Sequence, residues 1–142
     1  MYQRLVLVGN LGRDPEMRYT PNGTAVTSLS VATSRKYTTA DGQQKEETVW
    51  FRVSVWGKQA EPCNQYLSKG RKVLVEGTLV PDENGGPRIW TDKEGKPRAS
   101  FEVRANTVRF LDSKRDSAPG AASGAPEASL DDQPTTGEEL PF

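Results

Sequence analysis

The stretch VWFRVSVWGKQAEPCNQYLSKG, residues 49–70, changes its periodicity partway along. Residues 49–57 alternate with a period of two, which predicts a β-strand with one apolar and one polar face. The apolar face, which we expect to line a core, comprises Val49, Phe51, Val53 and Val55. Residues 58–70 then follow helical spacing, with Gly70 suited to end a helix and Pro62 tolerated only in its first turn. The stretch therefore predicts a strand followed directly by one short helix.

Strand-like segments lie on both sides of this helix. They cover residues 4–12 and 24–35 before it, and residues 71–80, 88–91 and 97–111 after it. Polar residues 36–47 carry Asp41-Gly42, which predicts the tip of a hairpin. The order of three strands, one short helix and further strands favours an all-β fold, a five-stranded OB-fold barrel with its helix between strands three and four. A β-sandwich is the alternative, but it gives no reason for a single central helix.

The composition argues against an enzyme, a zinc protein and a membrane protein. The chain has 142 residues, no histidine and a single cysteine, Cys63, so it lacks the usual general base, a Cys–His pair and a zinc ligand set. No apolar run of about 18 residues exists, and the start of the chain does not resemble a signal peptide. We therefore expect a cytoplasmic protein with no catalytic residues, no metal, no cofactor and no membrane partner.

The net charge of zero hides two oppositely charged parts. Residues 1–115 hold all 19 Lys and Arg residues and 13 acidic residues, whereas residues 116–142 hold six acidic residues and no basic ones. The basic part suggests a polyanionic partner. The acidic part is rich in Ala, Gly, Pro and Ser and cannot bury enough surface to fold, so it is predicted to be disordered. We expect a domain over 1–111, a disordered linker over 112–130 and an acidic protein-interaction tip over 131–142.

The polar face of the strand at 49–57 carries two of the three tryptophans. Trp50 and Trp56 lie about 20 Å apart along a strand, with Arg52 between them. An indole stacks on any nucleic-acid base, and arginine adds phosphate contact and cation–π attraction. The alternative is that both indoles fill a second core layer or a subunit interface, since tryptophans are usually buried. The nearby charges of Arg52 and Lys58 favour an anion-binding face.

Two further aromatic residues stand beside basic residues near loop tips. Trp90 follows Arg88, and Tyr37 follows Arg35 and Lys36. A lone surface tyrosine is common, but the recurrence of this arrangement favours stacking sites, with Arg35, Lys36 and Arg88 as contacts to a nucleic-acid backbone. Another basic cluster, which is as compatible with the dipole of the preceding helix as with phosphate contact, comprises Lys69, Arg71 and Lys72.

The last residues, GEELPF, place an apolar anchor after acidic residues. This arrangement suits a peptide ligand that inserts its apolar end into a pocket with a basic rim. A random terminus is the alternative. The predicted tip comprises Asp131, Asp132, Glu138, Glu139, Leu140, Pro141 and Phe142.

Several motifs follow one another along the chain in a recognisable order: LVGNLGRDPEMRYTPNG (7–23), VATS (31–34), WFRVSVWGKQAE (50–61), YLSKG (66–70), VEG (75–77) and WTDKEG (90–95). Together they resemble the bacterial single-stranded DNA-binding protein family. The resemblance implies an OB barrel, a homotetramer, and single-stranded DNA wrapped around the outside. It implies base stacking by Tyr37, Trp50, Trp56 and Trp90. The contacts to the DNA backbone that it implies most directly are those of Arg52, Lys58, Lys69 and Arg88. It also implies that the tip recruits replication, recombination and repair proteins.

The chain departs from the family pattern in three places. The tip ends Leu-Pro-Phe rather than Ile-Pro-Phe, loop 81–87 is longer, and the linker is short. The resulting hypothesis is a non-enzymatic, nucleoid-associated coat for single-stranded DNA that binds without sequence preference. The alternatives are an RNA-binding OB module and an interaction scaffold whose main function lies in the tail.

Overall fold

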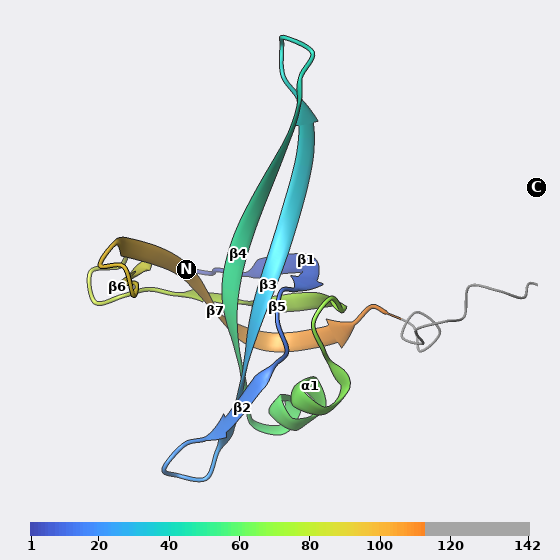
Figure 1. Cartoon of the computed structure of the whole chain (residues 1–142). Helices are drawn as coiled ribbons and strands as arrows, with labels where there is room; N and C mark the ends of the chain where they lie inside the picture. The colour runs from blue at the N-terminus through green and yellow to red at the C-terminus, as the bar shows by residue number, and fades with distance from the viewer. Residues whose placement is uncertain (113–142) are drawn as a thin grey trace, which may run out of the picture.

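The computed structural model describes residues 1–112 (Figure 1). These residues form strands β1 (Leu5–Leu11), β2 (Glu16–Tyr19), β3 (Ala25–Thr38), β4 (Gln44–Trp56), β5 (Lys72–Val80), β6 (Arg88–Thr91) and β7 (Pro97–Phe110), together with a 3-10 turn η1 (Gly57–Gln59) and the helix α1 (Ala60–Tyr66). No helix within them is long and apolar enough to cross a membrane.

Five of the strands close into a barrel. The hydrogen-bonded order is β1-β5-β7-β4-β3, and a short β1–β3 pairing at Asn10 and Leu11 joins the two ends. The close approach of β1 to β3 requires glycine at position 9, because a Cβ there would overlap the carbonyl oxygen of Ala32. The closed sheet excludes the β-sandwich. It confirms the predicted OB-fold barrel, with α1 between the third and fourth barrel strands.

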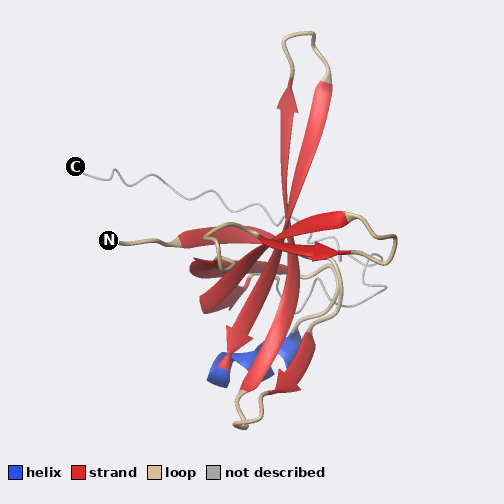
Figure 2. Ribbon diagram, turned by 90° about the vertical axis from the view of Figure 1, so that its left-hand side faces the viewer, coloured by secondary structure: helices blue, strands red, loops and turns tan. Residues whose placement is uncertain are grey.

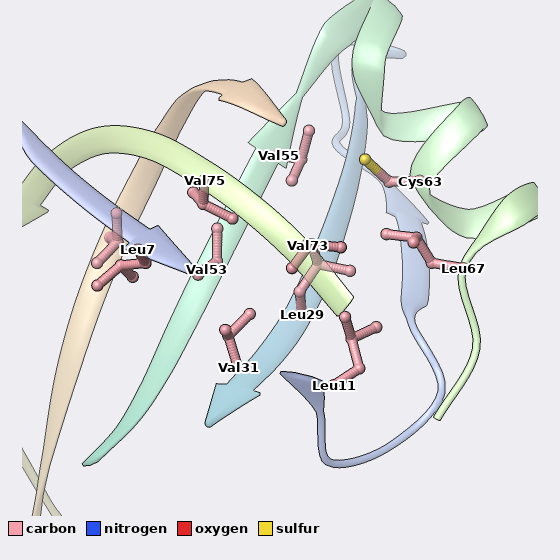
Figure 3. Close-up of a cluster of buried hydrophobic side chains, with 11 residues drawn as sticks. Leu7, Leu11, Leu29, Val31, Val53, Val55, Cys63, Leu67, Val73 and Val75 are labelled. Atoms are coloured by element: carbon pink, nitrogen blue, oxygen red, sulfur yellow. The ribbon is translucent and has the colours of Figure 1, made fainter. Parts of the chain in front are cut away.

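The core fills the barrel and extends under α1 (Figure 3). Alternate residues of the barrel strands point inward, and Val53 and Val55 of β4 are almost fully buried. The helix contributes Cys63, and Leu67 just after it completes this end of the core. The Thr27 hydroxyl fastens α1 to β3 by donating a 2.6 Å hydrogen bond to the Ala60 carbonyl oxygen. Helix α1 therefore closes one end of the barrel.

The predicted core face of β4 is only partly correct. Val53 and Val55 are buried and Phe51 packs against the core, but Val49 is 39% exposed. The reason is that β3 and β4 continue past the barrel as a two-stranded arm, where neither face has a third strand or helix to cover it (Figures 1 and 2). Alternation alone cannot show where along a strand the barrel ends.

Most of residues 36–47, predicted as a polar hairpin connection, belong to the strands of the arm. Pairing runs continuously out to Thr38 and Gln44, and the turn beyond them places Gly42 at a φ of 77°. The hairpin tip at Asp41-Gly42 was therefore predicted correctly, but its flanks are strand. Polar and charged side chains suit them because both faces of the ribbon meet solvent.

Two other boundaries differ from the prediction. Residues 16–19 form the short strand β2, which pairs with β3 and was not predicted because its four residues show no clear alternation. The helix ends at Tyr66 rather than Gly70, and Leu67 already has extended backbone angles. The predicted tip and all of the predicted linker except Asp112 lie outside the described residues.

Candidate nucleic-acid interface

Both tryptophans of β4 lie on the outside of the barrel. Trp50 is 53% exposed and Trp56 is 38% exposed, and Arg52 between them is also exposed. The strand alternates, so burying Val53 and Val55 inside the barrel turns the even-numbered residues outward. We refer to the outward side chains of Trp50, Arg52, Ser54 and Trp56 as the outer face of β4.

Neighbouring strands add more cations to this outer face. Ser54 is the register partner of Arg104 on β7, and residues paired in this way project to the same side of a sheet. The Arg104 guanidinium lies 5.3 Å from the centroid of the Trp56 ring, within the range of a cation–π interaction. Arg18 on β2 pairs with Val26, which pairs with Trp56 on β4, so Arg18 belongs to the same cross-strand row.

Trp50 is supported from the turn after β1. A Cβ placed on Gly12 would lie 2.6 Å from Cη2 of the Trp50 indole, so the ring rests against the backbone of this glycine. Gly12 is itself fixed by donating its backbone N–H to the Ser30 carbonyl oxygen at 2.9 Å. The Gly12 backbone thus supports one side of the indole, while about half of the Trp50 side chain remains open to solvent.

Trp90 lies on the β6–β7 hairpin and is 46% exposed. On the same face of this hairpin, Arg88 pairs in register with Ser100 and its guanidinium lies 3.3 Å from a carboxylate oxygen of Glu102. Glu102 is in turn the register partner of Arg52. The hairpin therefore continues the outer face of β4, with one carboxylate between the two arginines.

Tyr37 lies on the other side of the arm from Trp50. Along β3, Lys36 shares the ribbon face of Trp50, whereas Arg35 and Tyr37 share the opposite face with Glu47. The Glu47 carboxylate accepts hydrogen bonds from the Arg35 guanidinium at 2.8 Å and from the Tyr37 hydroxyl at 3.1 Å. The four predicted stacking residues are therefore all outside the core, but they do not share one face.

The charges around Tyr37 have consequences for its titration. The hydrogen bond to Glu47 raises the pKa of the Tyr37 hydroxyl. The hydrogen bond from Arg35 lowers the pKa of the Glu47 carboxyl, with a further contribution from Tyr37. Near neutral pH the tyrosine is protonated and the glutamate is ionised.

The remaining predicted contacts are spread around the barrel. Lys58 lies in η1, directly after the outer face of β4, and is exposed. Lys69, Arg71 and Lys72 follow α1 and lead into β5, which is separated from β4 by β7. The Lys69 backbone is fixed by Asp14 and the Lys72 backbone by Asp112. Strand register does not join this second cluster to Trp50 and Trp56.

Two cations beside the outer face of β4, Arg18 and Arg104, were not predicted from the sequence. The signal for Arg104 was present, because Phe101, Val103 and Ala105 alternate with the polar Glu102 and Arg104. Arg18 had no such signal, because its strand was not recognised. Among residues 1–112, no group of three or more His, Cys, Asp or Glu side chains could hold a metal ion.

The Single-strand binding protein family matches residues 2–111. This chain belongs to that family. It is 41% identical over 137 residues to a single-stranded DNA-binding protein of Wolinella succinogenes, covering 96% of this chain and 80% of that protein. It is 39% identical over 114 residues to one from Helicobacter hepaticus, covering 80% of this chain but only 64% of that protein.

Solved structures of this family share the fold. A deletion mutant of the single-stranded DNA binding protein from Thermus aquaticus matches with a TM-score of 0.60 and 33% identity, over 78% of this chain and 51% of that chain. An SSB of Plasmodium falciparum in complex with single-stranded DNA matches with a TM-score of 0.64 and 25% identity, over 79% and 97%. The family consists of non-enzymatic proteins, which agrees with the expectation from composition.

Proposed function

We propose that this protein binds single-stranded DNA without sequence preference, through the outer face of β4 and its continuation on the β6–β7 hairpin. The observation that carries the proposal is the exposure of Trp50 and Trp56 on one strand face, with Arg52 between them and Arg104 against Trp56. Family membership supports it, as does the complex of the Plasmodium falciparum relative with single-stranded DNA.

The division of labour follows from the chemistry of the side chains. The indoles of Trp50, Trp56 and Trp90 offer flat surfaces to the bases, and such stacking, known for this family, contributes about 1–3 kcal/mol per base. Arginines between them neutralise phosphates and make binding salt-dependent. Stacking needs unpaired bases, so duplex DNA is excluded by geometry rather than by charge.

We also propose that the protein is a homotetramer. The described surface supports an apolar contact between copies at β1, where Val6 and Val8 point outward and are exposed. Only the last two residues of β1 pair with β3, and Gly9 lies against β3, which leaves an open strand edge along residues 5–8. An exposed edge beside exposed valines favours pairing with a second copy.

The third proposal concerns the acidic tip. We infer that Leu140–Phe142, preceded by carboxylates, recruits proteins of replication, recombination and repair to DNA coated by the barrel in the cytoplasmic nucleoid. The support is the charge difference between the barrel and the tip in the sequence. Deleting Leu140–Phe142 is expected to abolish partner capture and leave DNA affinity intact. The alternative, a scaffold whose main function lies in the tail, predicts instead that Trp50→Ala and Trp56→Ala leave function intact.

A competition experiment tests the DNA proposal against the RNA alternative. Labelled oligo(dT) bound to the full chain is challenged with unlabelled oligo(dT), oligo(U) or a duplex of equal length. We expect only oligo(dT) to compete strongly. Equal or better competition by oligo(U) would support an RNA-binding module instead, and strong competition by the duplex would contradict stacking on unpaired bases.

A further inference from the structure

The arm formed by β3 and β4 carries three side chains that each contact the other two, Arg35, Tyr37 and Glu47. The Glu47 carboxylate uses one oxygen to accept from the Arg35 guanidinium at 2.8 Å and the other to accept from the Tyr37 hydroxyl at 3.1 Å. The Arg35 guanidinium also lies over the Tyr37 ring, 5.2 Å from its centroid. We refer to these residues as the arm triad.

This geometry conflicts with the simple role expected of Tyr37 and Arg35. A base can stack only on an open ring face, and the guanidinium occupies one of the two faces of Tyr37. A phosphate can attract only a cation whose charge is not already neutralised, yet Arg35 is paired with Glu47. Within the arm triad, the Arg35 guanidinium and one face of the Tyr37 ring are therefore already engaged by other side chains of the protein.

The triad is nevertheless easy to open. The side chains of Arg35 and Glu47 are 72% and 52% exposed, and ion pairs in such surroundings contribute little to stability. A phosphate offers the guanidinium the same kind of anionic oxygens as the carboxylate does. Exchange of one anion for the other therefore costs little, and Glu47 regains water when it is released.

We propose that Glu47 acts as a resident competitor for phosphate in the arm. The backbone phosphate of a single strand displaces the Glu47 carboxylate from Arg35, and the guanidinium moves off the Tyr37 ring so that a base stacks there. The inference rests on the proposed binding of single-stranded DNA and adds a positioning residue to it. Glu47 keeps the arm neutral until a strand with both a phosphate and an unpaired base arrives.

The test uses the salt dependence of binding. When Arg35 exchanges Glu47 for a phosphate, the freed carboxylate stays beside the strand as an uncompensated negative charge, so the arm neutralises little phosphate charge overall and adds little to the salt slope. In Glu47→Gln the contact releases a counterion outright, and the slope of log K against log[salt] becomes steeper by about 0.7 for each engaged arm. We also expect affinity for oligo(dT) at low salt to rise about two- to fivefold, the range that follows from losing one exposed ion pair.

Two variants control for simpler explanations. Asp41→Asn removes the same charge from the turn at the tip of the arm, beyond the last strand pair of Thr38 and Gln44, so its slope is expected to match the wild type. In an Arg35→Gln background, Glu47→Gln is expected to change neither slope nor affinity, because no guanidinium remains to be freed. Circular dichroism confirms that each variant is folded.

The outcomes separate this inference from the function on which it rests. Weaker binding of Glu47→Gln, or an unchanged slope, would overturn the inference and make Glu47 a support that holds Tyr37 for stacking. An equal steepening in Asp41→Asn would also overturn it, because the effect would then be one of general charge. Failure of the wild-type protein itself to bind oligo(dT) would contradict the proposed function instead.

Discussion

The Arg104 guanidinium lies 5.3 Å from the centroid of the Trp56 ring, although the two residues belong to different strands, β7 and β4. The contact joins a cation and a stacking surface on the outside of the barrel. It places a positive charge beside the ring that we propose stacks on a base.

Arg104→Met therefore tests the mixed character of this site. The variant keeps an unbranched side chain but loses its charge, so we expect severalfold weaker binding of oligo(dT) and a salt slope shallower by about 0.7. The control is Arg4→Met, which removes a cation from the β1–β5 side of the barrel, where Arg4 pairs with Glu76 at 2.9 Å. Equal losses of oligo(dT) affinity in both variants would mean that Arg104 acts only through the overall charge of the protein.

Gly12→Ala is expected to displace the Trp50 indole without unfolding the protein. The new Cβ would overlap the ring, which is the outer part of an exposed side chain and can move. We expect a shift in tryptophan emission and a loss of oligo(dT) affinity smaller than the loss in Trp50→Ala, which is about 1–3 kcal/mol. Gly86→Ala is the matched control, since the nearest atom to its Cβ would be 3.8 Å away. If Gly86→Ala bound oligo(dT) as weakly as Gly12→Ala, the supporting role of Gly12 would be refuted.

The position of Val49 beyond the barrel predicts a contrast in stability. Leu29 is 1% exposed within the core, so Leu29→Ala is expected to lower the free energy of unfolding by about 2–5 kcal/mol. Val49→Ala is expected to lower it by less than about 1 kcal/mol, because this side chain is 39% exposed. Chemical denaturation measures both changes. A large cost at Val49 would mean that its side chain is covered in solution.

The buried thiol of Cys63 predicts a loss of stability at high pH. Burial raises the pKa of Cys63 from its usual 9.0 to about 11. Because the folded state holds this proton more tightly, the stabilisation is complete below pH 9 and is lost as the pH rises towards 11, by about 2–3 kcal/mol. Cys63→Ser is expected to remove this dependence. A thiol reagent that reacts rapidly with the native protein at pH 8 would show that Cys63 is not buried.

The fold was largely predictable because its strongest signals are local. The alternation of residues 49–57 and the change to helical spacing after Gly57 set the barrel strand and the helix. Strand β2 and the extent of the arm were not predictable, because four polar-flanked residues carry no period and a ribbon open on both faces needs no apolar side. The remaining features of the fold depend on the register between paired strands, which the sequence pattern does not show.

The site was predictable as a list of residues but not as a surface. The outward direction of Trp50 and Trp56 followed from the alternation of one strand. The opposite direction of Tyr37 depends on the pairing of Tyr37 with Lys45 and of Arg35 with Glu47, which only the register of β3 against β4 reveals. The partnership of Trp56 with Arg104 needed the parallel pairing of β4 with β7, which joins segments about 50 residues apart in the sequence.

The most direct test of the central claim is a titration monitored by intrinsic tryptophan fluorescence. All three tryptophans lie on the surface proposed to bind DNA, and all are exposed. Adding oligo(dT) is predicted to quench the emission strongly, with affinity falling steeply between two salt concentrations, while a duplex of equal length leaves the emission nearly unchanged. No quenching by oligo(dT), or equal quenching by the duplex, would contradict the account.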